Sequence, residues 1–146
     1  DVLYFSNEQD CSVTGYRLNT GDGTLSAFQT ITTLPEGYTD QNTCSQIQVS
    51  ASGRFLYAPN RGHHSIACFS IDTASGQLTS NGIVASEARP NALCLGPQDR
   101  FLYSAGQESG RMASFSINSD SGKLTPLETY PLGKVPVWVS IAELPG

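Results

Sequence analysis

Apolar and polar residues alternate along three stretches of the chain, and the three stretches read alike. They cover residues 13–18, 66–71 and 112–117. The fourth position is aromatic in every copy, as Tyr16, Phe69 and Phe115, and the last position is aliphatic. Alternation with a period of two places one face of a strand on a hydrophobic core. The pattern therefore predicts three equivalent β-strands.

A second repeated stretch precedes each of these strands. A Leu-Tyr pair begins at residues 3, 56 and 102, so the copies are 53 and 46 residues apart. A period of this size, carried by short apolar runs with turn residues between them, is typical of stacked β units such as propeller blades. The sequence thus predicts three copies of one β module.

Two more pieces complete the module. A first strand is expected over residues 45–49, 91–95 and 137–141. The alternating strand is followed by a turn that carries a glycine, at Gly23, Gly76 and Gly122. We expect a positive φ at these glycines, because glycine adopts it without steric cost. No stretch shows a convincing amphipathic helix.

With the strands of a module lettered a to d, the pieces run b-c-d, a-b-c-d, a-b-c-d, a. The predicted fold class is all-β, a partial β-propeller of three four-stranded antiparallel blades in a single domain. The repeats span about residues 1–41, 42–88 and 89–133, and a closing strand in 134–146 should complete the first blade. Closed propellers have about four to eight blades. We therefore expect the remaining blades of a longer ring, or another copy of the chain, as partners.

Composition narrows the class of ligand. The 146 residues carry a net charge of −5, which argues against non-specific binding of nucleic acid. No apolar run approaches the roughly 18 residues of a membrane-spanning helix, so no membrane partner is expected. The chain begins at Asp1 without a visible signal peptide, and we interpret this terminus as cleaved, trimmed or engineered. Anionic small molecules remain compatible, because local arginines override net charge.

The cysteines do not suggest a metal site. They are Cys11, Cys44, Cys68 and Cys94, and they form no C-x-x-C pair and match no common zinc spacing. We expect reduced thiols, with Cys68 and Cys94 as small core residues; a disulfide between Cys11 and Cys44 is the alternative. No metal or other cofactor is expected, and free thiols favour a cytoplasmic protein.

Candidate chemistry gathers where the b–c and d–a connections of a propeller meet, on one rim around the axis. Glu8, Arg61 and Gln107 occupy equivalent positions of the three copies there, and His63 lies nearby. Opposite charges at equivalent positions suggest a site that arose by divergence. An arginine can bind a carboxylate or phosphate with two hydrogen bonds, and a carboxylate can accept a proton from water. A solvated Glu8 and a structural salt bridge of Arg61 are the alternatives.

Three further features carry weaker expectations. His63 and His64 are adjacent, so they point to opposite sides of a strand and are poorly placed to share one metal. The d–a connection 36–42 is the longest and could shape a pocket on the rim. Trp138 is expected to pack in the core. The sequence contains no G-x-S-x-G, P-loop or H-E-x-x-H motif.

Particular strings carry a family resemblance. They are Leu-Tyr-x-x-Asn-Glu at residues 3–8, the segment 52–66 and the turn at 72–78. Together they resemble the lactonase family of seven-bladed β-propellers, which includes 6-phosphogluconolactonase and carboxy-cis,cis-muconate lactonizing enzymes. The resemblance covers the whole chain and corresponds to the last three blades. It implies a small-molecule lactone, sugar-derived or carboxylated, as substrate.

The resemblance also implies roles for residues. The family's site combines a histidine, two arginines and a glutamate; Glu8 and Arg61 match the glutamate and one arginine, as catalytic residues. The residues expected to bind substrate around them are His63, Gln107, Asn7 and Asn60. Nothing in the chain matches the histidine or the second arginine, so the isolated chain is expected to be inactive. A non-catalytic scaffold or binding module is the alternative function.

Overall fold

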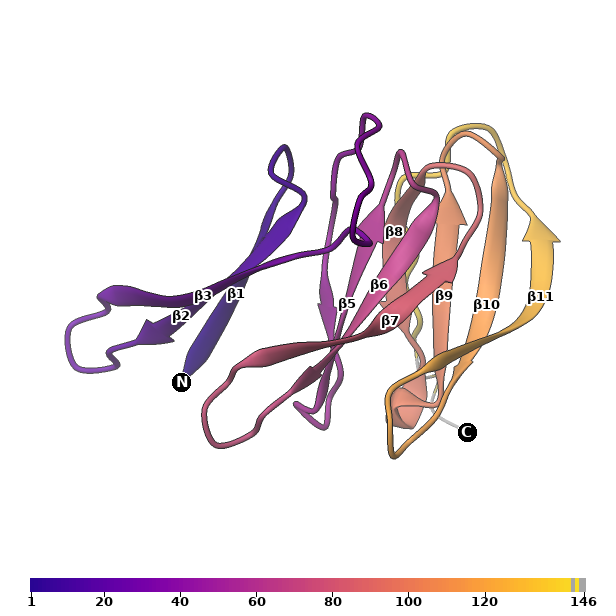
Figure 1. The fold of residues 1–146 in the computed structure, drawn as a ribbon. Coiled ribbons are helices and arrows are strands. Elements are labelled where there is room, and N and C mark those ends of the chain that lie inside the picture. Colours follow the sequence, from indigo (N-terminus) through magenta and orange to yellow (C-terminus); the bar gives the residue numbers. More distant parts are fainter. Residues whose placement is uncertain (143, 145–146) are drawn as a thin grey trace.

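The computed structural model describes residues 1–142 and residue 144, and it arranges them as three antiparallel sheets in a row (Figure 1). The first sheet holds β1 (Val2–Asn7), β2 (Ser12–Leu18) and β3 (Leu25–Thr32). The second holds β4 (Gln48–Val49), β5 (Phe55–Asn60), β6 (Ser65–Ile71) and β7 (Leu78–Ala85). The third holds β8 (Pro90–Leu95), β9 (Phe101–Gly106), β10 (Arg111–Ile117) and β11 (Leu124–Pro131), with a 3₁₀ turn at Pro97–Asp99.

The strand order confirms the all-β class and the repeated module. Each sheet is a meander in which consecutive strands pair, so the sheets read b-c-d, a-b-c-d and a-b-c-d. The register also repeats. The leucine of strand b lies opposite the aromatic residue of strand c in all three sheets, in the pairs Leu3–Tyr16, Leu56–Phe69 and Leu102–Phe115. Equivalent residues therefore occupy equivalent places in space.

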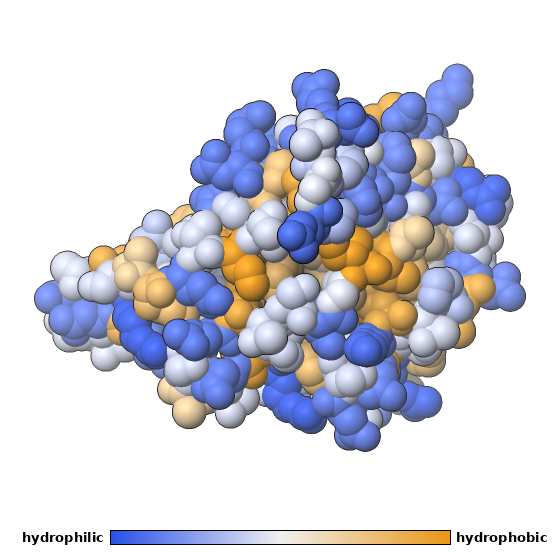
Figure 2. Space-filling model, in the orientation of Figure 1, coloured by the Kyte–Doolittle hydropathy of each residue, from blue (hydrophilic) through white to orange (hydrophobic). Residues whose placement is uncertain are grey.

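The middle sheet is buried on both faces, because its neighbours cover both. Alternate residues of β5 point to opposite sides: Phe55 and Tyr57 pack with residues of β8 to β10, whereas Leu56 and Ala58 pack with Val13 of the first sheet. These two clusters are the hydrophobic core. Figure 2 shows apolar atoms gathered in the middle of one face of the molecule, with polar residues around them.

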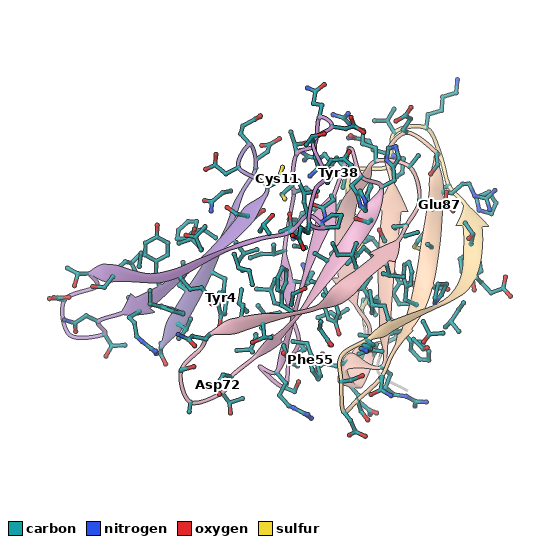
Figure 3. The ribbon with its side chains drawn as sticks, viewed as in Figure 1. Tyr4, Cys11, Tyr38, Phe55, Asp72 and Glu87 are labelled. Atoms are coloured by element: carbon teal, nitrogen blue, oxygen red, sulfur yellow. The ribbon has the colours of Figure 1, made fainter. Side chains whose placement is uncertain are left out.

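The c–d turns confirm the expectation for glycine. The φ angles of Gly23, Gly76 and Gly122 are 77°, 71° and 70°. Two of these turns also join neighbouring sheets. In each case the tyrosine on strand b of the preceding sheet donates a hydrogen bond to the carbonyl of the turn glycine. Tyr4 Oη lies 2.6 Å from the oxygen of Gly76, and Tyr57 Oη lies 2.9 Å from that of Gly122. Figure 3 shows Tyr4 beside the sheet that carries this turn.

The first strand of the module is shorter than predicted in the middle sheet. Of residues 45–49, Gln48–Val49 alone forms a strand, and Cys44 makes an isolated bridge to Asn60. The stretch between them lies opposite Pro59, which has no N–H to offer a ladder. The equivalent residue in β9 is Ala105, and there β8 pairs almost continuously.

The expectation for residues 137–141 was wrong, because they form no strand. A strand needs a partner, and this segment lies beside β8, where Asn91 donates to the carbonyl of Val137 (3.4 Å), and not along β1. Trp138 is 66% exposed, so its predicted core position was also wrong. Residues 143, 145 and 146 of the predicted closing strand lie outside the described residues. The four cysteines are free thiols, so Cys11 and Cys44 are not joined.

Candidate functional site at the rim

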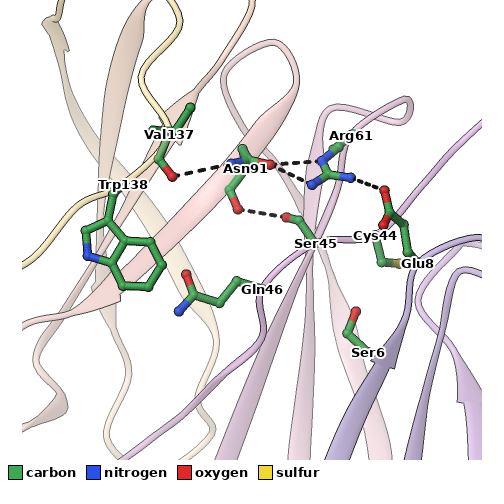
Figure 4. Close-up of a pocket in the computed structure, with 9 residues that line it drawn as sticks. All are labelled: Ser6, Glu8, Cys44, Ser45, Gln46, Arg61, Asn91, Val137 and Trp138. Carbon is green, nitrogen blue, oxygen red and sulfur yellow. Dashed lines mark hydrogen bonds and ion pairs between the residues drawn. The ribbon is translucent and has the colours of Figure 1, made fainter.

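Glu8 and Arg61 meet on the rim. Each follows the last residue of a strand b, β1 and β5 respectively, so the repeat aims both side chains at the junction between the first and second sheets. Arg61 Nη1 lies 2.6 Å from Glu8 Oε1 (Figure 4). The Arg61 side chain is 18% exposed and that of Glu8 is 58% exposed. The carboxylate is thus open to water, whereas the guanidinium is held in the wall.

Asn91 fixes the orientation of Arg61, and sequence reasoning missed this role. Its Oδ1 accepts from Nε (3.0 Å) and Nη2 (2.7 Å) of Arg61. Asn91 occupies the irregular position near the start of β8, where the register with β9 shifts between Pro90 and Ala92. The signal in the sequence is that the equivalent positions of the other copies are Ser45 and Val137, which differ from it in chemistry.

A cavity of about 310 Å³ lies beneath this ion pair. Its volume is at the lower end of the roughly 300–1,000 Å³ of small-molecule sites. Its lining residues come from β1, β8, the turns after β1 and β5, the segment before β4 and the segment after β11; they are Ser6, Glu8, Cys44, Ser45, Gln46, Arg61, Asn91, Val137 and Trp138. Residues from near both ends of the chain, Ser6 and Trp138, thus share one pocket.

The Cys44 thiol in this wall is not a nucleophile at neutral pH. Its side chain is fully buried, and burial raises its pKa to about 11. A thiol must lose its proton to attack a carbonyl or bind a metal. Among the described residues, no cluster of three or more His, Cys, Asp or Glu side chains could hold a metal ion. The acid-base chemistry available in the pocket therefore comes from Glu8.

Asn7 and Asn60 do not face the cavity, although both were expected to bind substrate. Asn60 is fully buried; its Nδ2 donates to the carbonyl of Thr33 (2.8 Å), and its Oδ1 accepts from Thr33 Oγ1 (2.7 Å) and Asn42 Nδ2 (3.1 Å). Asn7 donates to hydroxyls of β2, with Thr14 Oγ1 at 2.7 Å. Both amides hold the strands and loops that carry Glu8 and Arg61.

His63 and Gln107 also lie apart from the Glu8–Arg61 pair. His63 Nδ1 is 2.7 Å from Ser65 Oγ, and the ring packs edge-on against Tyr38 of the long d–a loop. Gln107 Oε1 accepts from Arg89 Nε (3.2 Å). A second cavity of about 320 Å³ on the rim is lined by Arg61, Arg89 and His64 among others, but not by His63 or Gln107.

Comparison with known proteins relates the chain to a protein family. The chain matches the family described as lactonase, 7-bladed beta-propeller, over residues 1–141. A 6-phosphogluconolactonase of Pectobacterium carotovorum is 33% identical over 141 residues, which are 97% of this chain and 42% of that protein. One from Bacillus subtilis is 34% identical over 84 residues, covering 58% of this chain and 24% of that protein.

Solved structures of similar proteins have the same fold as this chain. The periplasmic gluconolactonase PpgL of Pseudomonas aeruginosa superposes with a TM-score of 0.87 at 27% identity, over 93% of this chain and 38% of that one. A protein from Lactobacillus plantarum gives a TM-score of 0.87 at 25% identity, over 92% of this chain and 40% of that one. The chain spans less than half the length of these relatives. In the part that the structure describes, no helix is long and apolar enough to cross a membrane. This chain belongs to the lactonase family of seven-bladed β-propellers.

Proposed function

We propose that the three blades form part of a lactonase, and that the Glu8–Arg61 pocket takes part in hydrolysis of a sugar-derived or carboxylated lactone. The observation that supports this most is the ion pair itself. Glu8 and Arg61 come from different blades, are 53 residues apart in sequence, and meet at 2.6 Å over a cavity of about 310 Å³. The relatives named 6-phosphogluconolactonase favour a phosphorylated sugar lactone.

The geometry suits a division of roles. Arg61 uses Nε and one Nη2 hydrogen on Asn91, and its two Nη1 hydrogens on Glu8 and Thr43, so one Nη2 hydrogen is left for a ligand oxygen. In the proposed reaction Arg61 binds the carboxylate or phosphate of the substrate. The half-exposed Glu8 accepts a proton from water while the water oxygen bonds to the lactone carbonyl carbon. The ring C–O bond then breaks, and Glu8 returns the proton to the departing oxygen.

The rest of the ring completes the site in this proposal. The chain spans 42% of its Pectobacterium relative, and the resemblance implies a histidine and a second arginine that no residue of this chain is expected to match. They would come from the four other blades, or from another copy of the chain. We assign the protein to the cytoplasm, as the free thiols favour.

The test uses a complete ring, in which these blades replace the matching 141 residues of the Pectobacterium relative. Hydrolysis of 6-phosphogluconolactone is followed by proton release. We expect Glu8→Gln to lower kcat by about a hundredfold or more, and Arg61→Ala to raise KM. The control is Glu36→Gln, an exposed carboxylate on the long loop. Unchanged kcat/KM in both pocket variants would remove these residues from the reaction.

A second measurement tests the proposal if the chimeric ring does not fold. Trp138 is the single tryptophan and lines the pocket, so its fluorescence reports on binding of 6-phosphogluconate to the chain as it is. Arg61→Ala should abolish the change.

One observation favours the scaffold function. Glu8 and Arg61 bond to each other across two sheets, as a structural clamp would. A scaffold predicts that both variants lower the melting temperature and leave kcat/KM of the ring unchanged.

A further inference from the structure

The pocket is lined at positions where the three copies of the module differ. The residue two before Glu8 is Ser6, and its equivalents are Pro59 and Ala105, which are apolar and fully buried. The hydroxyl therefore occurs only in the copy that also carries Glu8. Both residues line the same cavity, Ser6 near the end of β1 and Glu8 in the turn that follows it.

The Ser6 hydroxyl has no hydrogen-bond partner among the described residues. It is buried, and Figure 4 shows it directed from β1 toward the pocket. A buried hydroxyl without a partner lowers the stability of the fold, because its desolvation is not offset by a hydrogen bond. Its donor and two acceptor sites are available to a polar group that enters the cavity, after a rotation about one side-chain bond.

Two more residues extend this region of the pocket. Gln46 and Trp138 occupy equivalent positions of the first strand, where the third copy has the buried Ala92. The Gln46 amide offers two donors and an acceptor. The indole N–H of Trp138 donates to Ser140 Oγ (2.7 Å), which holds the ring while it remains 66% exposed. An aromatic face held in this way can cover the C–H groups of a sugar.

We propose that Ser6, Gln46 and Trp138 form a subsite for the hydroxyl groups of a polyhydroxylated acid or its lactone. The inference rests on the proposed function in one respect, since Arg61 would bind the acidic end of the same ligand. A hydroxyl group both donates and accepts, which matches the Ser6 hydroxyl and the Gln46 amide. A lactone without hydroxyl groups would leave both unsatisfied, so the pocket should discriminate strongly against it.

The test compares two ligands of equal charge and carbon number. Gluconate carries a hydroxyl group on each carbon beyond its carboxylate, and hexanoate carries none. Binding to the chain is measured by titration calorimetry. We expect gluconate to bind at least about tenfold more tightly than hexanoate. Ser6→Ala and Gln46→Ala should each weaken gluconate binding by about three- to tenfold and leave hexanoate unchanged.

Matched controls remove the same groups elsewhere. Ser116→Ala changes a half-buried hydroxyl in β10, and Gln77→Ala an exposed amide in a c–d turn; neither should alter gluconate binding. Melting temperatures identify variants that fold poorly, and Ser6→Thr, which keeps the hydroxyl, should retain more affinity than Ser6→Ala.

The outcomes separate the two proposals. Equal affinity for gluconate and hexanoate, no detectable gluconate binding, or equal loss of both ligands in Ser6→Ala would overturn the hydroxyl subsite. Arg61→Ala should weaken both ligands alike, because it removes the anchor for the carboxylate. If it does so while Ser6→Ala has no effect, the anion site of the proposed function stands and the subsite fails. If Ser6→Ala is selective and Arg61→Ala has no effect, the subsite stands and the role of Arg61 fails.

Discussion

The two junctions between neighbouring sheets are alike where the c–d turns pack. At the first junction Tyr4 donates to Gly76, and at the second Tyr57 donates to Gly122. Donors and acceptors are equivalent residues of the repeat, so the same bond is made twice. This end of the molecule shows that the repeated sequence specifies how one blade docks on the next.

The junctions differ at the rim. Glu8 and Arg61 pair at the first junction, whereas at the second Arg61 bonds to Asn91, and Gln107 bonds to Arg89 of its own copy. Docking needs the same residues in each copy, but a binding site needs different ones, and the module separates these demands by place. The predictions below test this separation, from the largest expected effect to the smallest.

Asn60→Ala should be among the most destabilising changes, because Asn60 is fully buried at the rim of the first junction. It satisfies the carbonyl and hydroxyl of Thr33 and the amide of Asn42. The substitution takes the donor from the Thr33 carbonyl, removes one partner from each of the other two groups and opens a buried cavity. We expect a loss of about 3 kcal/mol in the free energy of unfolding, measured with urea.

The matched control is Asn7→Ala. Asn7 is the equivalent residue of the first copy, and its amide bonds to hydroxyls within one half-buried sheet. We expect a loss of about 1 kcal/mol there. Equal losses would show that Asn60 has no special part in the junction.

This contrast also shows where sequence reasoning works. The repeat placed Glu8 and Arg61 on one rim because equivalent residues occupy equivalent places. It did not separate Asn60, whose side chain turns inward, from a ligand-facing residue. It missed Asn91, Ser6 and Gln46, since they lie in or beside strands whose other residues are in the core. It also predicted a strand at 137–141, a segment that lies beside β8 but pairs with no strand.

Gly122→Ala should disrupt the opposite end of the second junction. The φ of Gly122 is 70°, and a Cβ there would overlap the ring of Phe55. Gly23 has a similar φ of 77° but nothing within 4 Å of a Cβ. We expect losses of about 3 kcal/mol for Gly122→Ala and about 1 kcal/mol for Gly23→Ala in urea unfolding. Equal losses would mean that backbone strain, and not docking, limits these turns.

Alkaline pH should weaken the rim of the first junction through Cys44. Burial raises its pKa from 9.0 to about 11, so the unfolded chain loses the thiol proton more readily than the folded one. The free energy of unfolding is therefore unaffected by this thiol below pH 9, and it falls by about 2 kcal/mol as the pH rises toward 11. Urea midpoints at pH 8 and pH 10.5 should therefore fall less in Cys44→Ala than in the parent chain. An identical fall in both would exclude Cys44 as a cause.

Tyr57→Phe should give the smallest effect and should define the docking bond most sharply. Tyr57 is fully buried, so removing its hydroxyl leaves the Gly122 carbonyl without that donor, and we expect a loss of about 1–2 kcal/mol in urea unfolding. Tyr4 is partly exposed, and Tyr4→Phe should cost about 0.5–1 kcal/mol because water can replace the bond.

Tyr103 is the equivalent residue of the third copy, on the sheet that ends the row, and Tyr103→Phe should change stability by less than about 0.5 kcal/mol. The order of the three losses follows from the place of each tyrosine in the row of sheets, since its chemistry is constant. A loss for Tyr103→Phe as large as that for Tyr57→Phe would show that the hydroxyl stabilises its own sheet, and the docking interpretation would fail.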